Sequence, residues 1–244
     1  MLRTFWYNLL HLVVAILRWP LMLTFITHGR EKLPARGPYL VVTNHTGIMD
    51  SPMIFTAVPT YDWGLLAGEK WGKNPLTSWL LGLSGAIFIK RGEVDRQALK
   101  EAEAALQRGC IFGLAPEGTR SKTGQMIQAR DGAAFLAVRA NVPIVPVGII
   151  RSDQWAANWK RGRWTRIEAF IGEPFMLPDL GRRPKGKEFG AFTELIMAHI
   201  AAELPPQYHG FYADSPALAA LQQGEDPWQA LVNEQLAMSN EQKE

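Results

Sequence analysis

His45 and Asp50 are the residues of this sequence whose types and spacing suggest chemistry. His45 follows a short apolar run, residues 40–43, which is typical of a buried strand. Asp50 precedes Ser51 and Pro52, a pattern typical of a helix N-cap with a proline in the first turn. Neighbours on one helix are three or four residues apart, so a strand, turn and helix would bring this pair together. A carboxylate on one ring nitrogen would leave the other nitrogen as a general base.

The same two residues also have an ordinary structural interpretation. Asp50 would then be only a helix cap, and His45 a hydrogen-bonded turn residue. The pair alone leaves both interpretations open, so the rest of the chain has to decide between them.

The composition describes an ordinary globular chain. Its 244 residues are 47% hydrophobic and 20% charged, enough for one α/β domain or two small ones. The single cysteine, Cys110, excludes an internal disulfide framework and suggests a reducing, intracellular compartment. The five histidines are scattered without metal-ligand spacing, so we expect no metal site.

Charge is distributed unevenly along the chain. Residues 1–187 carry 25 Lys and Arg against 14 Asp and Glu, a balance of +11, whereas residues 188–244 carry 1 against 9, a balance of −8. The body of the chain is therefore basic and its tail acidic. A basic body suits an anionic surface or a ligand that carries phosphate, with nucleic acid as the competing candidate.

Apolar strands and helices alternate between residues 40 and 150. Further strands are expected at 86–89, 110–115 and 142–150, and helices at 53–58, 76–83, 95–109 and 128–141. This alternation predicts an α/β fold with a mostly parallel sheet flanked by helices. Ligands of such sheets bind at the carboxyl ends of strands, which is where these residues fall: His45, Lys90, Arg91, Glu117, Thr119 and Arg120.

The last of these strands contains prolines. Pro143 and Pro146 cannot donate ladder hydrogen bonds, which predicts an edge, a bulge or a strand end.

The N-terminal residues 5–27 are mostly apolar but are interrupted by polar residues and Pro20. A spanning helix needs about 20 predominantly apolar residues, so we predict two short helices broken near Pro20. Trp6 and Trp19 prefer the headgroup level, which favours an interfacial membrane anchor in one leaflet. The alternative is an apolar helix packed on the domain. The segment lacks an Ala-x-Ala-like cleavage site, so we do not expect a signal peptide.

The segment 151–187 is basic, with a strand expected at 164–172, and a helix is expected at 188–204. The tryptophans of segment 151–187 interleave with Arg and Lys, a mixture that suits either stacked bases or a lipid headgroup layer. We divide the chain into an anchor (1–28), an α/β domain (29–204) and an acidic helical tail (205–244).

Four blocks of this sequence resemble, in order, those of the glycerophospholipid acyltransferases of the lysophosphatidate acyltransferase type: residues 44–50, 87–92, 116–121 and 142–147. The resemblance covers roughly residues 30–175. It implies transfer of a fatty acyl group from acyl-coenzyme A or acyl carrier protein to the hydroxyl of a lysophospholipid, giving phosphatidate from 1-acylglycerol-3-phosphate. No serine or cysteine nucleophile is required, because the acceptor hydroxyl attacks the thioester directly.

The resemblance also implies roles for individual residues. His45 would be the base and Asp50 its orienter; Pro146 would lie near the acyl donor. The acceptor would be held by Glu117, Gly118, Thr119 and Arg120, with Arg91 and Arg120 on its phosphate. A backbone N–H near Gly118, or in the turn after His45, would bind the oxyanion. We expect no cofactor beyond the acyl donor.

The expected partners are a membrane lipid and the membrane surface, without nucleic acid, at the cytoplasmic face of the inner membrane in a peripheral or monotopic arrangement. Three alternatives remain. The first is a lipid-binding protein with a degenerate site, and the second a thioesterase or hydrolase using the same base. The third is nucleic-acid binding through the Trp/Arg segment.

Overall fold

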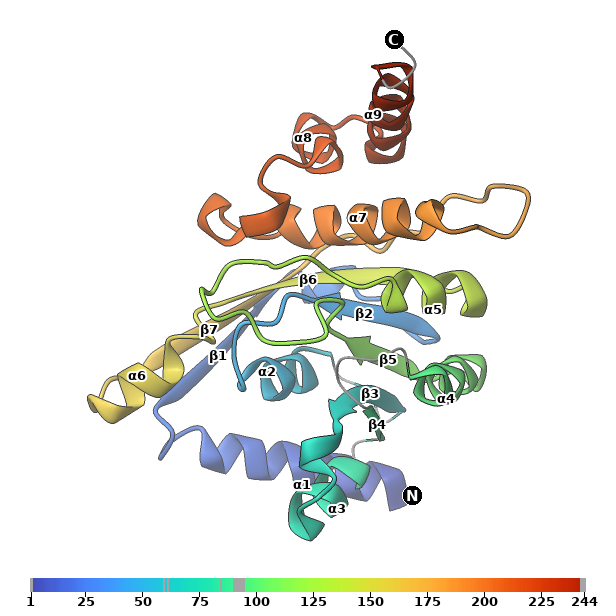
Figure 1. Ribbon diagram of the computed structural model, residues 1–244. Coiled ribbons are helices and arrows are strands. Elements are labelled where there is room, and N and C mark those ends of the chain that lie inside the picture. The colour runs from blue at the N-terminus through green and yellow to red at the C-terminus, as the bar shows by residue number, and fades with distance from the viewer. Residues whose placement is uncertain (1, 59, 61, 84, 90–94, 242–244) are drawn as a thin grey trace.

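Within the described residues, seven strands form one sheet at the centre of the molecule (Figure 1). The computed structural model describes residues 2–58, 60, 62–83, 85–89 and 95–241. The strands are β1 (Leu23–His28), β2 (Tyr39–Thr43), β3 (Trp63–Gly68), β4 (Ala86–Ile89), β5 (Ile111–Leu114), β6 (Ile144–Ile150) and β7 (Thr165–Ile171). The helices are α1 (Leu2–Leu17), α2 (Asp50–Ala57), α3 (Pro75–Leu83), α4 (Arg96–Gln107), α5 (Gly132–Ala140), α6 (Trp155–Lys160), α7 (Lys187–Ala202), α8 (Pro216–Gln223) and α9 (Pro227–Glu241).

The strand order across the sheet is β1-β7-β6-β2-β5-β3-β4, with β2 in the middle. Neighbouring strands are parallel except β6 and β7, which are antiparallel. All residues of β2 are buried, as expected for a short run of β-branched and aromatic side chains at the centre of a sheet. The predicted α/β fold with a mostly parallel sheet flanked by helices is confirmed.

Helices cover both faces of the sheet (Figure 1). On one face the core contains Leu106 of α4, Leu136 of α5 and Phe192 of α7. Helices α8 and α9 pack on α7, so that α7 is buried on both sides. On the other face Met53 and Phe55 of α2 fill the core, and α1 adds partly buried side chains.

The sheet order brings three connecting segments to one edge. Because β2 lies between the parallel strands β5 and β6, the segments that follow these strands all leave from the same side of the sheet. The loop after β5 reaches the turn after β2, where Ser121 N donates to His45 O at 2.8 Å. This is the edge at which sheets of this kind bind ligands.

Pro146 lies in β6, an interior strand, and Pro143 directly precedes it, so the edge-strand prediction is wrong, the strand-end prediction is confirmed for Pro143, and Pro146 lies beside a bulge. Val147 pairs with Ile171, but the isolated bridge further along joins Ile144 to Phe175, which shifts the register by one residue. Pro146 lies opposite Gly172 beside this bulge, whose extra residue is on the segment between Gly172 and Phe175. The carbonyl of Pro146 accepts from Gly172 N at 2.9 Å, and because proline has no N–H the reciprocal hydrogen bond of this pair is absent.

The predicted pair of N-terminal helices is corrected by the structure. Residues 2–17 form α1, but residues 23–28 are strand β1, which pairs in parallel with β7. The sequence Leu-Thr-Phe-Ile-Thr-His is rich in β-branched and aromatic residues, which explains the strand. No helix among residues 2–58, 60, 62–83, 85–89 and 95–241 is long and apolar enough to cross a membrane.

Three elements went unpredicted: β3, α6 and α8. β3 reads Trp-Gly-Leu-Leu-Ala-Gly, and its glycines hide the strand pattern; Gly64 is needed because a β-carbon there would meet the ring of Phe112. Helix α8 follows Ser215, whose side chain caps it by accepting from Leu218 N. The division into segments 1–28, 29–204 and 205–244 stays a prediction, although β1 is joined to the sheet.

Candidate active site

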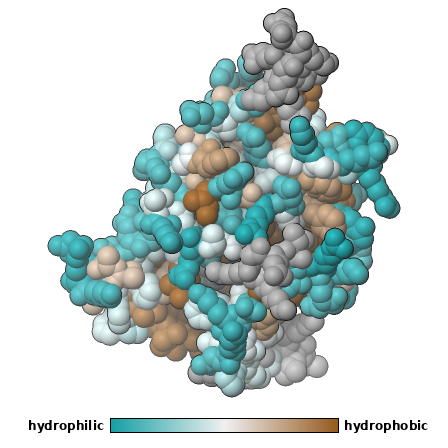
Figure 2. Space-filling model, in the orientation of Figure 1, coloured by the Kyte–Doolittle hydropathy of each residue, from teal (hydrophilic) through white to brown (hydrophobic). Residues whose placement is uncertain are grey.

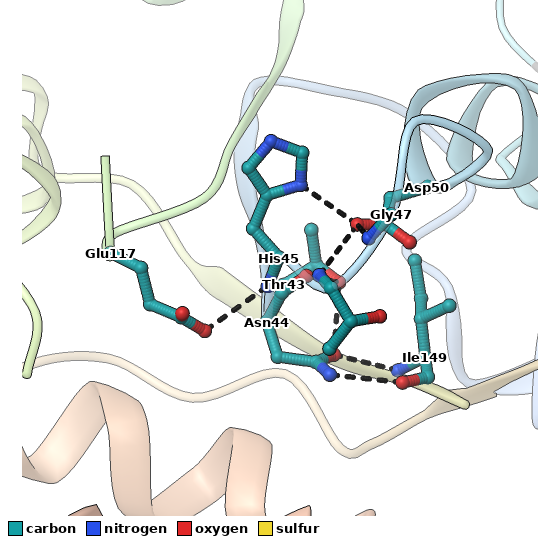
Figure 3. A network of polar contacts seen from close by, with 8 residues as sticks. Thr43, Asn44, His45, Gly47, Asp50, Glu117 and Ile149 are labelled. Carbon is teal, nitrogen blue, oxygen red and sulfur yellow. Dashed lines mark hydrogen bonds and ion pairs between the residues drawn. The ribbon is translucent and has the colours of Figure 1, made fainter. Parts of the chain in front are cut away.

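The side chains of His45 and Asp50 are in direct contact. His45 Nδ1 lies 2.7 Å from Asp50 Oδ2 (Figure 3). The same oxygen accepts from the backbone N–H groups of Thr46 and Gly47, each at 2.9 Å. The sequence pattern predicted that Asp50 caps α2. Asp50 is instead the first residue of this helix, and its side chain turns back to the loop after β2. The ring is therefore aligned by an acceptor that the turn itself fixes.

The turn that carries His45 is tied to the neighbouring strand β6. Asn44 is fully buried, its Oδ1 accepts from Ile149 N at 2.8 Å, and its Nδ2 donates to Ile149 O at 2.9 Å (Figure 3). Gly47 packs against Ser152 so closely that a β-carbon would collide with that residue. These contacts leave the turn little freedom, so the position of the imidazole is set by backbone and buried side chains.

Glu117 lies on the other side of the same turn. Its side chain is buried, with 2% of the residue exposed, and Oε1 accepts from His45 N at 3.1 Å (Figure 3). Burial raises the pKa of Glu117 to about 8, and the nearby Asp50 charge adds to this, against hydrogen bonds from the backbone of His45 and Ile127. Glu117 therefore holds the backbone of the turn that carries His45, and its raised pKa keeps a proton on the carboxyl group at neutral pH.

A cavity of about 1210 Å³ opens beside His45 and Asp50. It passes between the carboxyl ends of β3 and β5 towards α4 and α5. Its apolar lining includes Ile54, Trp63, Leu65, Leu66, Leu99 and Phe135. A space of this size, with an apolar wall beside the imidazole, suits a ligand with a long apolar part.

The remaining predicted site residues are distributed unevenly around this cavity. Gly118 lines it, whereas Thr119, Arg120 and Pro146 are not among the described residues that do. Pro146 is buried in β6 and lies close to Gly172. Arg91 lies outside the described residues. The predicted binding roles of these residues stay predictions.

Arg130 lines the cavity and was missed in the sequence analysis. Its side chain passes over Gly118, close to where a β-carbon of that residue would lie, and Arg130 N donates to Pro116 O at 3.0 Å. Gly118 has a positive φ of 68°, which favours glycine at this turn. The signal available in the sequence was an arginine directly before the Asp-Gly that begins α5.

The backbone groups predicted to bind an oxyanion already donate within the protein. The N–H groups of Thr46 and Gly47 bond to Asp50, and Gly118 N donates to Ala115 O at 3.1 Å. An oxyanion would thus need a donor other than these three groups. Within the described part of the chain, no group of three His, Cys, Asp or Glu side chains is arranged to hold a metal ion.

Comparison with known proteins defines the family. Residues 24–150, just over half of the chain, match the family model described as Acyltransferase. The chain therefore belongs to the acyltransferase family, which confirms the resemblance seen in the four sequence blocks.

Individual relatives agree with this assignment. The 1-acyl-sn-glycerol-3-phosphate acyltransferase of Bacillus subtilis is 24% identical over 71% of this chain and 84% of its own length. The lyso-ornithine lipid O-acyltransferase of Pseudomonas aeruginosa is 29% identical over 66% of this chain and 59% of its own length. The chain spans about half the length of several other curated relatives.

A solved structure shares the fold. It is the crystal structure of the 1-acyl-sn-glycerophosphate acyltransferase PlsC from Thermotoga maritima, with a TM-score of 0.56 and 29% identity over 71% of this chain and 69% of that chain.

The buried Glu117 predicts a specific pH dependence of stability. Its folded-state pKa of about 8 exceeds the ordinary 4.5, so between these values the folded chain keeps a proton that the unfolded chain releases. The free energy of unfolding should fall as pH rises through this window, by at most about 1.4 kcal/mol per pH unit from this group. Glu117→Gln should remove that contribution, as measured by urea denaturation at a series of pH values.

Glu225→Gln provides the matched control, because Glu225 is an exposed glutamate away from Glu117. It should leave the wild-type slope unchanged. Equal slopes for Glu117→Gln and the wild-type protein would show that Glu117 is ionised in the folded chain.

Proposed function

We propose that this protein transfers a fatty acyl group from an acyl thioester to the free hydroxyl of a lysophospholipid, with 1-acylglycerol-3-phosphate as the acceptor and phosphatidate as the product. The observation that carries this proposal is the His45–Asp50 pair at 2.7 Å beside a large, mostly apolar cavity. The names of relatives support the acceptor, because the Bacillus subtilis protein is named for it.

His45 acts as the general base in this proposal. Nδ1–H of His45 donates a hydrogen bond to Asp50. The lone pair of the neutral ring therefore lies on Nε2, which points away from Asp50 (Figure 3). Nε2 takes the proton of the acceptor hydroxyl as its oxygen bonds to the thioester carbonyl carbon. The carbon–sulfur bond then breaks, and the imidazolium returns the proton to the leaving thiolate.

Asp50 stabilises the imidazolium formed during this step. It is buried, and its Oδ2 is held by two backbone N–H groups besides the ring. An oriented carboxylate needs no rearrangement when the charge develops, which is the basis of electrostatic stabilisation in enclosed sites. An alcohol is a weak nucleophile at neutral pH, and a positioned base contributes roughly 100- to 10,000-fold to such a transfer.

The apolar part of the cavity binds the acyl chain in this proposal. The side chains of Leu65, Leu66 and Leu99 lie along its wall, away from the polar end at His45. A fatty acyl chain would bury its methylene groups there, each contributing about 0.8 kcal/mol. The donor is acyl-coenzyme A or acyl carrier protein, and no other cofactor takes part.

The phosphate of the acceptor binds to arginine. Arg130 lines the cavity that also exposes His45, and the resemblance adds Arg91 and Arg120. A guanidinium offers a planar fork of donors that matches phosphate oxygens. Glu117, Gly118 and Thr119 keep the acceptor-binding role that the resemblance implies, with Glu117 acting through the backbone of His45.

We place the protein on the cytoplasmic face of the inner membrane, with α1 lying in the interface. One side of α1 packs on α2, where Tyr7 contacts Phe55, while the other side exposes large apolar residues: Phe5, Leu9, Leu12, Ile16 and Leu17. This exposed stripe is typical of a helix that lies in one leaflet.

His45→Ala should lower acyl transfer at least about 100-fold, because the hydroxyl loses its base. The measurement is phosphatidate formation from a labelled acyl donor and 1-acylglycerol-3-phosphate. His28→Ala is the matched control: His28 also contacts a carboxylate, Glu168, at 2.9 Å, but it does not line the cavity. His28→Ala should keep wild-type turnover.

Normal transfer by folded His45→Ala would exclude this mechanism. Release of free fatty acid by the wild-type protein at the same rate with and without acceptor would indicate a thioesterase instead, and acceptor binding without turnover a lipid-binding protein.

Arg130→Ala should raise KM for 1-acylglycerol-3-phosphate about 10- to 100-fold, the loss of one charge-assisted contact. KM for an unphosphorylated monoacylglycerol should change little, and Arg108→Ala, an exposed residue away from the cavity, should change neither value. Arg120→Ala tests the residue that the resemblance implies in the same assay.

Equal losses for phosphorylated and unphosphorylated acceptors in Arg130→Ala would contradict its role. A lyso-ornithine lipid belongs in the same panel, because one relative is named for that acceptor. Preference for it over 1-acylglycerol-3-phosphate would replace the phosphate acceptor in this proposal.

A further inference from the structure

Three exposed tryptophans and three exposed cations gather at the junction between α1, β1 and α6. We call this region the Trp–Arg corner; it consists of Trp19, Trp159, Lys160, Arg161, Arg163 and Trp164. The exposed fractions of the tryptophans are 77% for Trp19, 45% for Trp159 and 53% for Trp164. An indole normally buries most of its surface, so three such residues exposed together suggest a surface that meets a partner.

Hydrogen bonds join the two parts of the corner to each other. Trp159 Nε1 donates to Pro20 O at 3.1 Å, and Thr165 N, next to Trp164, donates to Met22 O at 2.8 Å. Trp155 Nε1 donates to Leu21 O at 3.0 Å. The turn after α1 and the residues around α6 are therefore joined, although they are far apart in the sequence. Figure 1 shows α6 beside the end of α1.

The charge of the corner has one sign. No acidic residue occurs between Asp153 and Glu168, while Lys160, Arg161, Arg163 and Arg166 all lie in this interval. Arg166 is paired with Glu168 at 3.1 Å, and Lys160, Arg161 and Arg163 are exposed. Figure 2 shows hydrophilic side chains projecting over α6 at the lower left, beside a hydrophobic patch. Exposed cations interleaved with indoles match an anionic layer that has an apolar interior.

The corner lies at the edge of the sheet that carries His45. Strand β6 is parallel to β2 and leads directly into the segment before α6. Ser152 of that segment packs against Gly47, which belongs to the turn that carries His45. On its other side the corner continues into the exposed apolar stripe of α1 through Ile16, Leu17 and Trp19. A flat partner that touches α1 would therefore also reach the corner.

We propose that the Trp–Arg corner docks on an anionic lipid bilayer, as a second contact that fixes the rotation of the protein about α1 and turns the edge of the sheet that carries His45 towards the lipid. The proposal rests on the proposed function in one respect, that α1 lies in the interface. Nucleic acid fits this surface less well, because the corner is continuous with the aliphatic stripe of α1, which offers bases and phosphates no contact.

Vesicle binding of the full chain tests the proposal. Arg161→Glu/Arg163→Glu reverses two exposed charges, and Trp164→Ala removes one exposed indole. The matched controls are Arg36→Glu/Arg108→Glu, two exposed arginines beside the amino ends of β2 and β5, and Phe211→Ala, an exposed aromatic residue following α7. Binding is measured by co-sedimentation with vesicles of phosphatidylcholine, alone or mixed with phosphatidylglycerol.

Arg161→Glu/Arg163→Glu should bind the phosphatidylglycerol-containing vesicles at least about tenfold more weakly than the wild-type protein, an estimate from about 1 kcal/mol per cation near an anionic surface. Trp164→Ala should also bind them more weakly, because it loses an indole that prefers the headgroup level. The charge variant should lose less on phosphatidylcholine alone, and both controls should bind like the wild-type protein. Turnover of detergent-dispersed substrate should stay unchanged in all four variants, so that loss of docking is distinguished from loss of catalysis.

Equal vesicle binding by corner and control variants would overturn the proposal. A larger loss of binding to a single-stranded oligonucleotide than to vesicles would overturn it in favour of nucleic acid. Absence of acyl transfer in every form of the protein would contradict the proposed function but would leave the vesicle result to decide on the corner.

Discussion

One carboxylate oxygen organises the candidate active site. Asp50 Oδ2 accepts three hydrogen bonds, from the imidazole of His45 and from two backbone N–H groups of the turn that carries it. Because the two backbone hydrogen bonds fix the position of the acceptor oxygen, the ring can keep its own hydrogen bond to Asp50 in only one orientation. The direction of the second ring nitrogen is therefore a property of the fold.

The sheet supplies the frame that makes this interaction possible. β2 is the middle strand, and its neighbours each secure one side of the turn: Asn44 bonds to Ile149 of β6, while Glu117 after β5 bonds to His45 N. Two buried acids this close would repel each other if both were charged. The raised pKa of Glu117 resolves this, since a protonated Glu117 still accepts the hydrogen bond from His45 N.

Sequence patterns predicted the elements that follow simple periodicity and missed those that do not. Strands β2, β5 and β6 and helix α4 were recognisable from apolar runs and caps, and the His45–Asp50 contact followed from the strand, turn and helix around it. β3 was hidden by its glycines, and β1 by its place beside an apolar helix. Arg130 was missed because its position before the Asp-Gly of α5 shows only that it lies near a helix start, whereas its entry into the cavity depends on the path of the loop between β5 and α5.

The central claim is that Asp50 holds the hydrogen on Nδ1 of His45 and leaves Nε2 free as the base. Nitrogen-15 NMR of the histidine side chains measures this directly, with His45→Gln used to assign the signal. The account predicts that the neutral ring of His45 carries its hydrogen on Nδ1 in the wild-type protein and loses this preference in Asp50→Asn. A ring that carries its hydrogen on Nε2 in the wild-type protein would contradict it.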